Sequence, residues 1–427
     1  MKMKLQKYKL GELLDVKRGA SLTGEYYATS GNYIRLTCGN FDYKNNSFKI
    51  NTSKDDLYYT GPVRDEFIMK RGDIITPLTE QAIGLLGSTA IIPEDNKYIQ
   101  SQDVAKIICK ESVLHPMYAF YLISSETVKR QLSVAAQQTK IRHTSPDKIK
   151  DCVVWIPDLE EQKRIASILS ALDNKIALNR EINQNLEAMA KQIYDYWFVQ
   201  FDFPNEEGKP YKSSGGEMVW NDKLKRKIPS SWETSLVDDV ADVFNGATPS
   251  TSDEQNYGGD IIWITPKDLS DQKQKFIYQG ERNISKAGYD SCSTHLLPIN
   301  TILMSSRAPI GLLSIAKVEL CTNQGFKSFV PKENRFATYL YYYLQFHIKQ
   351  IEQLGTGTTF KEVSREEVLR FPILKPSDSI INLWDEIVSV LNNKQLELQK
   401  ENENLTKQRD EFLPLLMNGQ VSIPNCD

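Results

Sequence analysis

An internal repeat constrains the fold of this 427-residue chain more than any other feature. Three collinear matches define it, at offsets of 219 and 227: ILSALDNK at 168–175 with IVSVLNNK at 387–394, IGLL at 83–86 with IGLL at 310–313, and D-V-x-x-G at 15–19 with the same motif at 242–246. Because the matches keep their order, two copies of one plan follow each other along the chain. The sequence therefore predicts a duplicated fold.

Each copy begins with short β-rich runs that Gly, Asn and Pro separate. YIRL at 33–36 and IIWI at 261–264 are typical of buried strands. A tyrosine-rich helix is predicted in both copies, around 117–122 and 339–344. We therefore predict a mixed α+β protein in which an α/β domain opens each copy. The pattern leaves the order of the strands open.

A long helix is predicted to end each copy. Asp158-Leu159-Glu160-Glu161 has the form of a capping box, which marks a helix start. Apolar residues then recur at alternating spacings of four and three, the heptad pattern of helices that pack on each other. The predicted seam comprises Leu169, Leu172, Ile176, Leu186 and Ile193 in the first helix and Val388, Leu391, Leu398, Leu405 and Phe412 in the second. We expect the two helices to form an antiparallel coiled coil; the alternative is that each packs only on its own domain.

These patterns divide the chain into six segments. They are a first α/β domain at 1–157, a long helix at 158–200, a linker at 201–228, a second α/β domain at 229–376, a second long helix at 377–419 and a tail at 420–427. A helix of about 38 residues spans ~57 Å, whereas half-sites one turn of DNA apart lie ~34 Å from centre to centre. The helix pair is therefore long enough to hold two domains over separate half-sites of one duplex.

Charge is distributed unevenly along the chain. Overall, 52 Lys and Arg against 55 Asp and Glu give a net charge of −3, which excludes a uniformly basic DNA-coating protein. Residues 1–157 carry 22 basic against 17 acidic residues, residues 229–376 carry 15 against 17, and residues 377–427 carry 4 against 9. The basic first domain fits a polyanion as partner, because Lys and Arg neutralise phosphates and release counterions. The second domain fits one less well by net charge.

Polar loops in both domains hold the side chains that read base edges. Asn and Gln bind adenine, and Arg and Lys bind guanine, in the major groove of DNA. The candidate DNA-binding residues are Lys17, Arg18, Arg35, Gln81, Gln138, Lys140 and Arg142 in the first domain and Asn245, Lys267, Arg307, Gln324, Thr358 and Lys361 in the second. For any single one of these residues, an ordinary position in a solvated loop is as compatible with the sequence as a DNA contact.

The sequence shows no catalytic or metal-binding motif. Gly355–Thr359 lacks the lysine of a phosphate-binding loop, and the four histidines are isolated from one another. The six cysteines form no C-x-x-C pair, which is typical of reduced intracellular thiols. Neither a signal peptide nor a membrane span is expected. Two alternatives stay open: a nuclease or methyltransferase with an atypical active site, and a coiled-coil scaffold unrelated to DNA.

The whole chain resembles the specificity (S) subunits of type I restriction–modification systems. The resemblance lies in the repeat of domain plus long helix, in the linker YWFVQFDFPN at 196–205 with GKPYKSSGG at 208–216, and in the ending LPLLMNGQ at 413–420. The linker match is specific, whereas the two domains are only generically similar to the family.

The resemblance implies a non-catalytic, cytoplasmic subunit whose two target-recognition domains each read one half of a bipartite, asymmetric DNA sequence. It also implies that the helices set the number of unread base pairs and dock two methyltransferase (modification) subunits, with two restriction (motor-nuclease) subunits in the full complex. S-adenosylmethionine, ATP and Mg²⁺ would be bound by those partners, and no cofactor by this chain. The acidity of the second half is a departure that makes its DNA affinity depend on the partners' surfaces.

Overall fold

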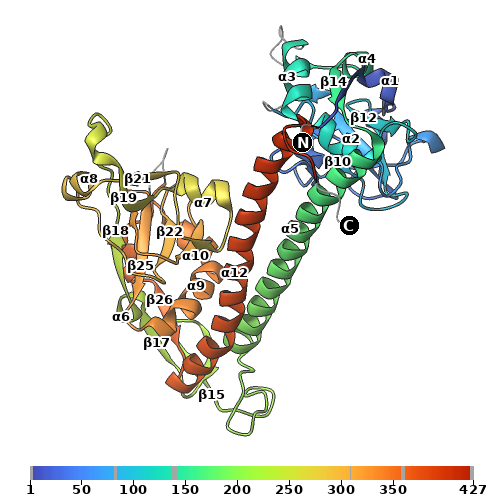
Figure 1. The fold of residues 1–427 in the computed structure, drawn as a ribbon. Coiled ribbons are helices and arrows are strands. Elements are labelled where there is room, and N and C mark those ends of the chain that lie inside the picture. The colour runs from blue at the N-terminus through green and yellow to red at the C-terminus, as the bar shows by residue number, and fades with distance from the viewer. Residues whose placement is uncertain (1–2, 81–83, 136–141, 308, 357–360, 424–427) are drawn as a thin grey trace. The chain divides into compact units, whose positions relative to one another are not determined.

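The computed structural model describes residues 3–423 apart from 81–83, 136–141, 308 and 357–360. The chain divides into two compact units, which are described separately below. Unit 1 comprises Met1–Asn179 with Glu401–Asp427, and unit 2 comprises Arg180–Lys400. Both long helices, α5 (Leu159–Tyr194) and α12 (Asp378–Met417), are shared between the units, so each unit contains one α/β domain and a stretch of each helix (Figure 1).

Two four-stranded sheets form the α/β domain of unit 1. The first is antiparallel and has the order β10-β8-β12-β2: Ala90–Ile91, Ile74–Pro77, Val104–Cys109 and Leu14–Arg18. The second has the order β11-β4-β7-β3: Tyr98–Ile99, Tyr33–Arg35, Tyr58–Tyr59 and Tyr27–Ala28. Three further strand pairs complete the domain: β1 (Gln6–Lys9) with β14 (Val153–Ile156), β5 (Phe41–Asp42) with β6 (Ser47–Phe48), and β9 (Thr79–Glu80) with β13 (Arg142–His143).

Unit 2 repeats this plan with an additional strand in its main sheet. The main sheet has the order β18-β25-β22-β23-β20: Ala241–Asn245, Phe326–Pro331, Ile302–Ser305, Leu313–Ala316 and Phe276–Ile277. The second sheet has the order β21-β19-β24: Arg282–Ile284, Tyr257–Ile264 and Cys321–Thr322. Two further pairs join β15 (Met218–Asn221) to β16 (Arg226–Pro229) and β17 (Glu233–Leu236) to β26 (Pro372–Lys375). The run β18-β25-β22-β23 matches β2-β12-β8-β10 of unit 1, so the repeat in the sequence is a repeat in the fold.

The matched glycines of the repeat occupy matched backbone positions. A Cβ atom at Gly19 would lie 2.3 Å from the carbonyl oxygen of Ser101, and one at Gly246 would lie 2.2 Å from those of Thr322 and Asn323. No real side chain tolerates such distances, because the neighbouring atoms belong to the backbone. The D-V-x-x-G motif therefore recurs because, in both units, the backbone at the end of one strand passes against a backbone segment distant in sequence, with no room for a side chain.

We expect Gly246→Ala to destabilise unit 2 by about 1–3 kcal/mol, the usual cost of forcing a methyl group into a packed site. Hydrogen exchange of peptides from β18 and β25 measures the effect. Gly24→Ala is the control, since a Cβ there meets nothing within 4 Å. Unchanged protection of both strands in the Gly246 variant would contradict this explanation of the motif.

A buried tyrosine-rich helix packs beside the main sheet of each unit. These are α2 (Pro116–Ile123) in unit 1 and α9 (Ala337–Phe346) in unit 2, and Tyr118, Tyr339 and Tyr342 are at most 2% exposed. The other helices of the described residues are short: α1 (Leu10–Leu13), α3 (Glu126–Ala135), α4 (Pro146–Lys150), α6 (Val237–Val240), α7 (Pro266–Gln272), α8 (Lys286–Asp290), α10 (Ile348–Leu354) and α11 (Arg365–Leu369). None of the helices in the described ranges combines the length and apolar character that a membrane span requires.

The start of α5 and the end of α12 coincide with helix start and stop signals in the sequence. The Asp158 carboxylate accepts a hydrogen bond of 2.9 Å from the Glu161 backbone N–H, which caps the start of α5. At the other end of α5, one π-helical turn at Asp195–Val199 leads into the linker. Helix α12 stops before Gly419, whose φ of +65° is the left-handed conformation that terminates many helices.

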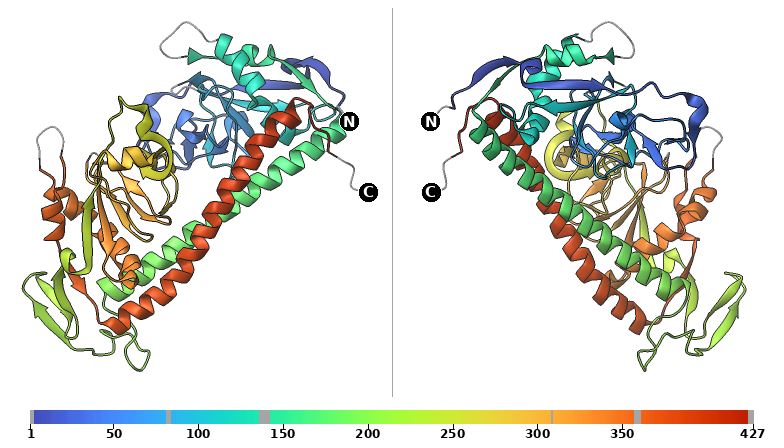
Figure 2. Two further views of the ribbon diagram at one scale, coloured as in Figure 1. Left: turned by 60° about the vertical axis from the view of Figure 1, so that its left-hand side comes forward. Right: turned by 90° about the vertical axis from the view of Figure 1, so that its right-hand side faces the viewer.

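The two long helices run antiparallel within each unit (Figure 2). In unit 1, Asn179 of α5 donates to Glu401 of α12 at 2.7 Å, and Asp173 accepts from Arg409 at 3.1 Å. Residue numbers thus fall along α5 as they rise along α12. In unit 2, the Gln395 side chain of α12 donates to the Asn183 carbonyl oxygen at 3.2 Å. The chain is accordingly a tandem repeat of two α/β domains, each followed by a long helix, with the helices paired as an antiparallel coil.

The seam residues differ in how deeply they are buried. Four are buried: Leu169, Ile176, Val388 and Leu398. Five are half-buried: Leu172, Leu186, Ile193, Leu391 and Leu405. Phe412 is the exception, because the residue is 44% exposed and Leu413 packs on the unit 1 core instead. A strict heptad drifts by about 20° per repeat against a straight helix, and the last turns of α12 pack on the α/β domain, so the seam pattern fails there.

The linker between the repeats packs on the core of unit 2. Phe203 stacks on Trp232 with ring centroids 4.7 Å apart, and Phe201 meets the same indole edge-on. A hairpin of β15 (Met218–Asn221) and β16 (Arg226–Pro229) follows, and Arg226 lies over the Phe201 ring. The linker's aromatic residues therefore form part of a folded core.

Candidate nucleic-acid interface

In unit 1, segments far apart in the sequence meet around Thr79. The Thr79 hydroxyl donates to the Asp103 carboxylate at 3.2 Å and lies 3.3 Å from Nδ1 of His143. Strand β13 pairs with β9, which places Arg142 opposite Glu80 along the backbone. Residues 79–80, 101–103 and 142–143 thus converge on one rim of the domain.

Lys17 and Arg18 adjoin this rim at the end of β2. Both side chains are exposed, and the Arg18 guanidinium donates to the Gln102 carbonyl oxygen at 2.9 Å. A guanidinium with one backbone contact keeps further donors free for a ligand such as phosphate. Among the described candidates of unit 1, these two cations are the ones that solvent and a partner reach directly.

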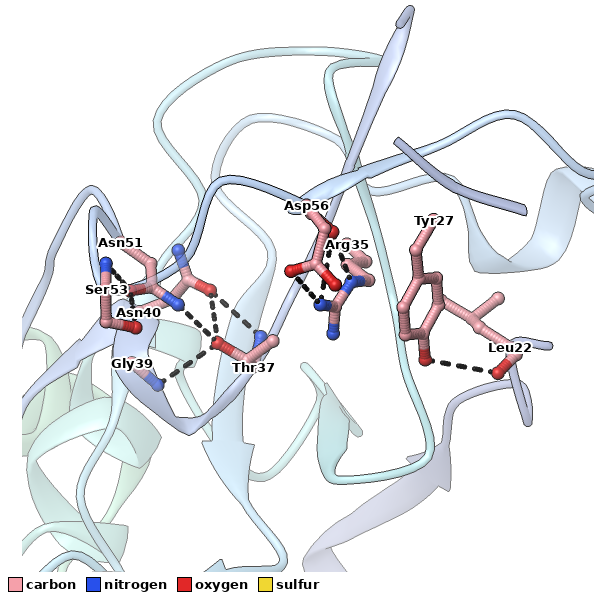
Figure 3. A network of polar contacts seen from close by, with 9 residues as sticks. All are labelled: Leu22, Tyr27, Arg35, Thr37, Gly39, Asn40, Asn51, Ser53 and Asp56. Atoms are coloured by element: carbon pink, nitrogen blue, oxygen red, sulfur yellow. Dashed lines mark hydrogen bonds and ion pairs between the residues drawn. The ribbon is translucent and has the colours of Figure 1, made fainter. Parts of the chain in front are cut away.

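Arg35 is placed differently from Lys17 and Arg18. Its side chain is buried, donates to the backbone and carboxylate oxygens of Asp56 at 3.2 Å, and lies 3.8 Å from the centroid of the Tyr27 ring (Figure 3). An arginine held on three sides cannot reach a base edge without losing those contacts. Arg35 therefore contributes to the packing of the second sheet, because its side chain is buried at the end of β4.

A hydrogen-bonded turn beside the rim escaped the sequence analysis. Thr37 accepts from the side chain of Asn51 at 2.9 Å (Figure 3). Asn40, 1% exposed, donates to the Lys49 carbonyl oxygen at 3.1 Å. The Cys38 thiol approaches the Thr79 carbonyl oxygen at 3.4 Å, which joins the turn to the rim. The available signal was the Thr-x-x-Asn spacing, typical of a side-chain-capped turn.

In unit 2, three segments meet in the same manner. The Ser306 N–H donates to the Gly325 carbonyl oxygen at 2.8 Å, and the Val363 N–H donates to the Ser306 carbonyl oxygen at 3.1 Å. The exposed Gln324 accepts from the Thr248 hydroxyl, three residues after the exposed Asn245. Residues 305–307 and 322–325, together with Thr356 and residues 361–363, therefore share one rim, which is the counterpart of the rim in unit 1.

Acidic side chains hold the cations of this second rim. Arg307 pairs with Glu362 at 3.0 Å, and the nearly buried Lys327 approaches the same carboxylate at 3.3 Å. The exposed Lys361 precedes that glutamate in the chain, and the exposed Lys267 at the start of α7 pairs with Glu281 at 2.6 Å. The pairs of Arg307 and Lys267 are exposed and therefore weak, so a phosphate or base edge competes for these two cations at little cost, whereas Lys327 is buried.

Several candidates lie outside the described residues. They are Gln81, Gln138, Lys140 and Thr358, together with the side chain of Arg142. Their neighbours Glu80, His143 and Thr356 belong to the two rims, since each takes part in a backbone pairing there.

The described residues contain no group of three or more His, Cys, Asp or Glu side chains that could hold a metal ion. Burial raises the pKa of the Cys38, Cys152 and Cys321 thiols to about 11. These thiols are therefore neutral at physiological pH, whereas a nucleophilic cysteine needs its thiolate form. The chemistry of the two rims is that of hydrogen-bond donors and acceptors with cations at their edges.

Buried polar contacts attach the α/β domain of unit 1 to its helices. The Tyr121 hydroxyl of α2 donates to Asp173 of α5 at 2.6 Å, and Arg409 of α12 binds the other oxygen of that carboxylate. Burial and the Asp173 charge raise the pKa of Tyr121 well above its usual value, so its hydroxyl is a donor. One carboxylate thus connects the domain to both helices.

Unit 2 uses a similar arrangement with the cation on the domain. The Lys275 ammonium donates to Glu187 of α5 at 2.9 Å and to Asn392 and Gln395 of α12 at 2.7 and 3.1 Å. The Tyr342 hydroxyl of α9 also donates to Glu187, at 3.0 Å. In the sequence, Gln395 and Arg409 occupy heptad positions that are apolar in most coiled coils. These two polar residues were the signal for the attachments.

Two α/β domains of one topology, each with a polar rim on three converging loops, define a duplicated recognition protein. A family model described as "Type I restriction modification DNA specificity domain" matches residues 3–188 and 229–407. The chain belongs to this family of specificity subunits, which are DNA-recognition components and not enzymes.

Individual relatives agree with this assignment. The HindI specificity subunit of Haemophilus influenzae is 27% identical over 473 aligned positions, which cover 97% of this chain and 99% of the relative. The MjaIX specificity subunit of Methanocaldococcus jannaschii is 36% identical over 198 residues, 44% of this chain and 45% of that relative. The crystal structure of the S subunit from M. genitalium shares the fold, with a TM-score of 0.62, 16% identity and coverage of 100% of this chain and 97% of that one.

Proposed function

We propose that each α/β domain, at residues 1–157 and 229–376, is a target-recognition domain that reads one half of a bipartite, asymmetric DNA sequence. The observation that carries the proposal is the rim: in each domain, three separated loops bring polar side chains and cations together. The two rims rest on one topology but carry different residues. Two different readers on a repeated framework would read two different half-sites, whereas identical readers would favour a palindrome.

The long helices, at 158–200 and 377–419, would act as the spacer that fixes the number of unread base pairs. Their repetition offers two equivalent surfaces, which suits the docking of two methyltransferase subunits, with two restriction subunits added in the full complex. S-adenosylmethionine, ATP and Mg²⁺ would then bind to those partners in the cytoplasm of a prokaryotic cell. The linker 201–228 would connect the two repeats, and the tail 420–427 would follow the second helix.

Mapping methylated adenines in the source genome tests this function most directly. The expected result is one asymmetric, two-part sequence with a constant gap. The enzyme alternative predicts instead that the purified chain, supplied with cofactors, cleaves or methylates DNA by itself. The scaffold alternative predicts no sequence-selective, salt-sensitive complex in a mobility-shift assay with the methyltransferase partner present.

The spacer role predicts a defined change when both helices are lengthened. One heptad inserted after Asn179 and one after Lys400 leaves the contacts inside each unit intact, because both insertions fall at the boundary between the units. Seven residues add about 10.5 Å of helix, or about three base pairs at about 3.4 Å each. We expect methylation at the same two half-sites with a gap about three base pairs longer.

A single insertion after Asn179 is the matched control. It shifts α5 against α12 and is expected to abolish methylation, because the seam on each side of the insertion loses its partner. An unchanged gap in the double variant would refute the spacer role.

A further inference from the structure

The most exposed large hydrophobic side chain of the described residues lies in a loop that the sequence analysis did not select. Ile50 is 72% exposed and belongs to the segment Lys49–Lys54, between β6 and β7. Single exposed apolar residues are common on protein surfaces and need no explanation by themselves. The surroundings of Ile50 are what distinguish it.

The loop is held firmly at its base, so the exposure of Ile50 is built into the fold. The Lys49 N–H donates to the Asn40 carbonyl oxygen at 2.9 Å, and the buried Asn40 side chain donates back to the Lys49 carbonyl oxygen. One residue beyond Ile50, the Asn51 side chain donates to Thr37 and accepts from the Ser53 N–H at 3.0 Å (Figure 3). Ile50 is therefore held between two anchored residues, with its side chain in solvent.

The same turn adjoins the rim of unit 1. Cys38, which follows Thr37, approaches the Thr79 carbonyl oxygen at 3.4 Å, and Thr79 contacts Asp103 and His143. A Cβ at Gly39 would lie 2.5 Å from the Asn51 side chain, so the loop sits directly against the turn that touches the rim. A buried contact thus joins the turn to the rim, and the loop packs directly against that turn.

The chemistry of the loop matches the major groove of DNA. The thymine methyl group is the apolar feature that this groove presents, and aliphatic side chains contact it. The exposed Lys49 and Lys54 flank Ile50 and suit the phosphates on either side, while Asp56 is already paired with Arg35. Asp55 offsets one lysine, so the loop's net attraction for phosphate is modest.

We propose that the loop Lys49–Lys54 is a base-reading element of the first domain, in which Ile50 contacts a thymine methyl group in one half-site. The inference rests on the proposed DNA-reading function and assigns part of it to residues outside the expected loops. An aliphatic side chain held in one position distinguishes thymine from the other bases, because only thymine places a methyl group at that point of the major groove.

Replacing single thymines by deoxyuracil in a duplex probe removes only the 5-methyl group and so tests the contact. We expect the complex of the full chain with its methyltransferase partner to lose about 4-fold in affinity at one such position, the value of one buried methyl group. With Ile50→Ala, the unsubstituted probe is expected to bind more weakly and the deoxyuracil substitution at that position to have no further effect. Val113→Ala, an exposed β-branched residue of the same domain that is 41% exposed, is the matched control and keeps the full deoxyuracil effect.

Each other outcome overturns the proposal. Additive effects of Ile50→Ala and deoxyuracil at every position would show that Ile50 contacts no thymine methyl group. Weaker assembly of the subunits with unchanged deoxyuracil sensitivity would assign the loop to a protein partner. If the unmodified complex prefers no sequence at all, the proposed function itself fails, which is a distinct result.

Lys49→Ala should reduce the slope of log affinity against log salt by about 1 without altering base preference.

Discussion

Lys275→Met is expected to destabilise unit 2 by about 3 kcal/mol, at the lower end of the range for breaking a buried ion pair. The lysine side chain is 9% exposed, and its removal deprives Glu187 of its closest cation. Lys191 stays 3.5 Å from the same carboxylate, which limits the loss. Burial lowers the pKa of Lys275 to about 8 although the Glu187 charge opposes that shift, so the ammonium is charged at neutral pH.

The double variant Lys275→Met with Glu187→Leu separates the charge from the shape of the site. Removing both partners leaves no uncompensated charge, so it is expected to recover at least half of the loss. Peptide-resolved hydrogen exchange is the suitable measurement, because a chain of two units does not unfold in one step. Protection should fall in α9 of unit 2 and be unchanged in α2 of unit 1. A double variant as unstable as the single one would show that packing, and not the ion pair, attaches the domain to the helices.

Trp384→Ala is expected to cost unit 2 about 3–5 kcal/mol, the usual range for truncating a large buried aromatic side chain. Trp384 of α12 is 0% exposed, and its ring lies 5.1 Å from that of Phe198, 5.7 Å from that of Tyr342 and 5.8 Å from that of Tyr194. These neighbours come from α5, the turn that follows it, and α9. The substitution would therefore loosen the attachment of both helices to the second domain, and methylation of the native target should be lost at 37 °C.

Trp384→Phe is the informative control. The indole N–H of Trp384 has no hydrogen-bond partner among the described residues, so phenylalanine removes an unsatisfied buried donor while keeping most of the packing. We expect a cost well below that of alanine, with methylation retained. Equal losses for the two variants, measured by thermal unfolding and by methylation, would mean that a polar role of the indole has been overlooked.

The parts of the fold that follow from periodicity could be predicted from the sequence. The duplicated plan, the long helices and the capping by Asp158 depend on local spacing and on side chains near in sequence. The strand order of the sheets could not be predicted, because most strands have two to five residues and pair across long intervals, as β2 does with β12. Such pairings are decided by the whole core and not by a local pattern.

The candidate site shows the same limit. Loops rich in Gln, Thr and Arg were selected by composition, and the structure brings their described neighbours onto one rim in each unit. Composition could not distinguish Arg18, which is exposed, from Arg35, which a partner strand and Asp56 enclose. Nor could it indicate Ile50, since an apolar residue in a short β-rich run is normally assigned to the core.

The sharing of both long helices between the units has a consequence for a broken chain. Cleavage after the exposed Lys212 would divide the molecule into fragments that are each unable to complete a core alone. The N-terminal fragment supplies Tyr194, Trp197 and Phe198 to the core of unit 2, and the C-terminal fragment supplies Leu416 and Met417 to the core of unit 1. Each fragment thus contributes buried residues to a core that lies mostly in the other fragment. We therefore expect the two fragments of a cleaved chain to stay associated without a covalent bond.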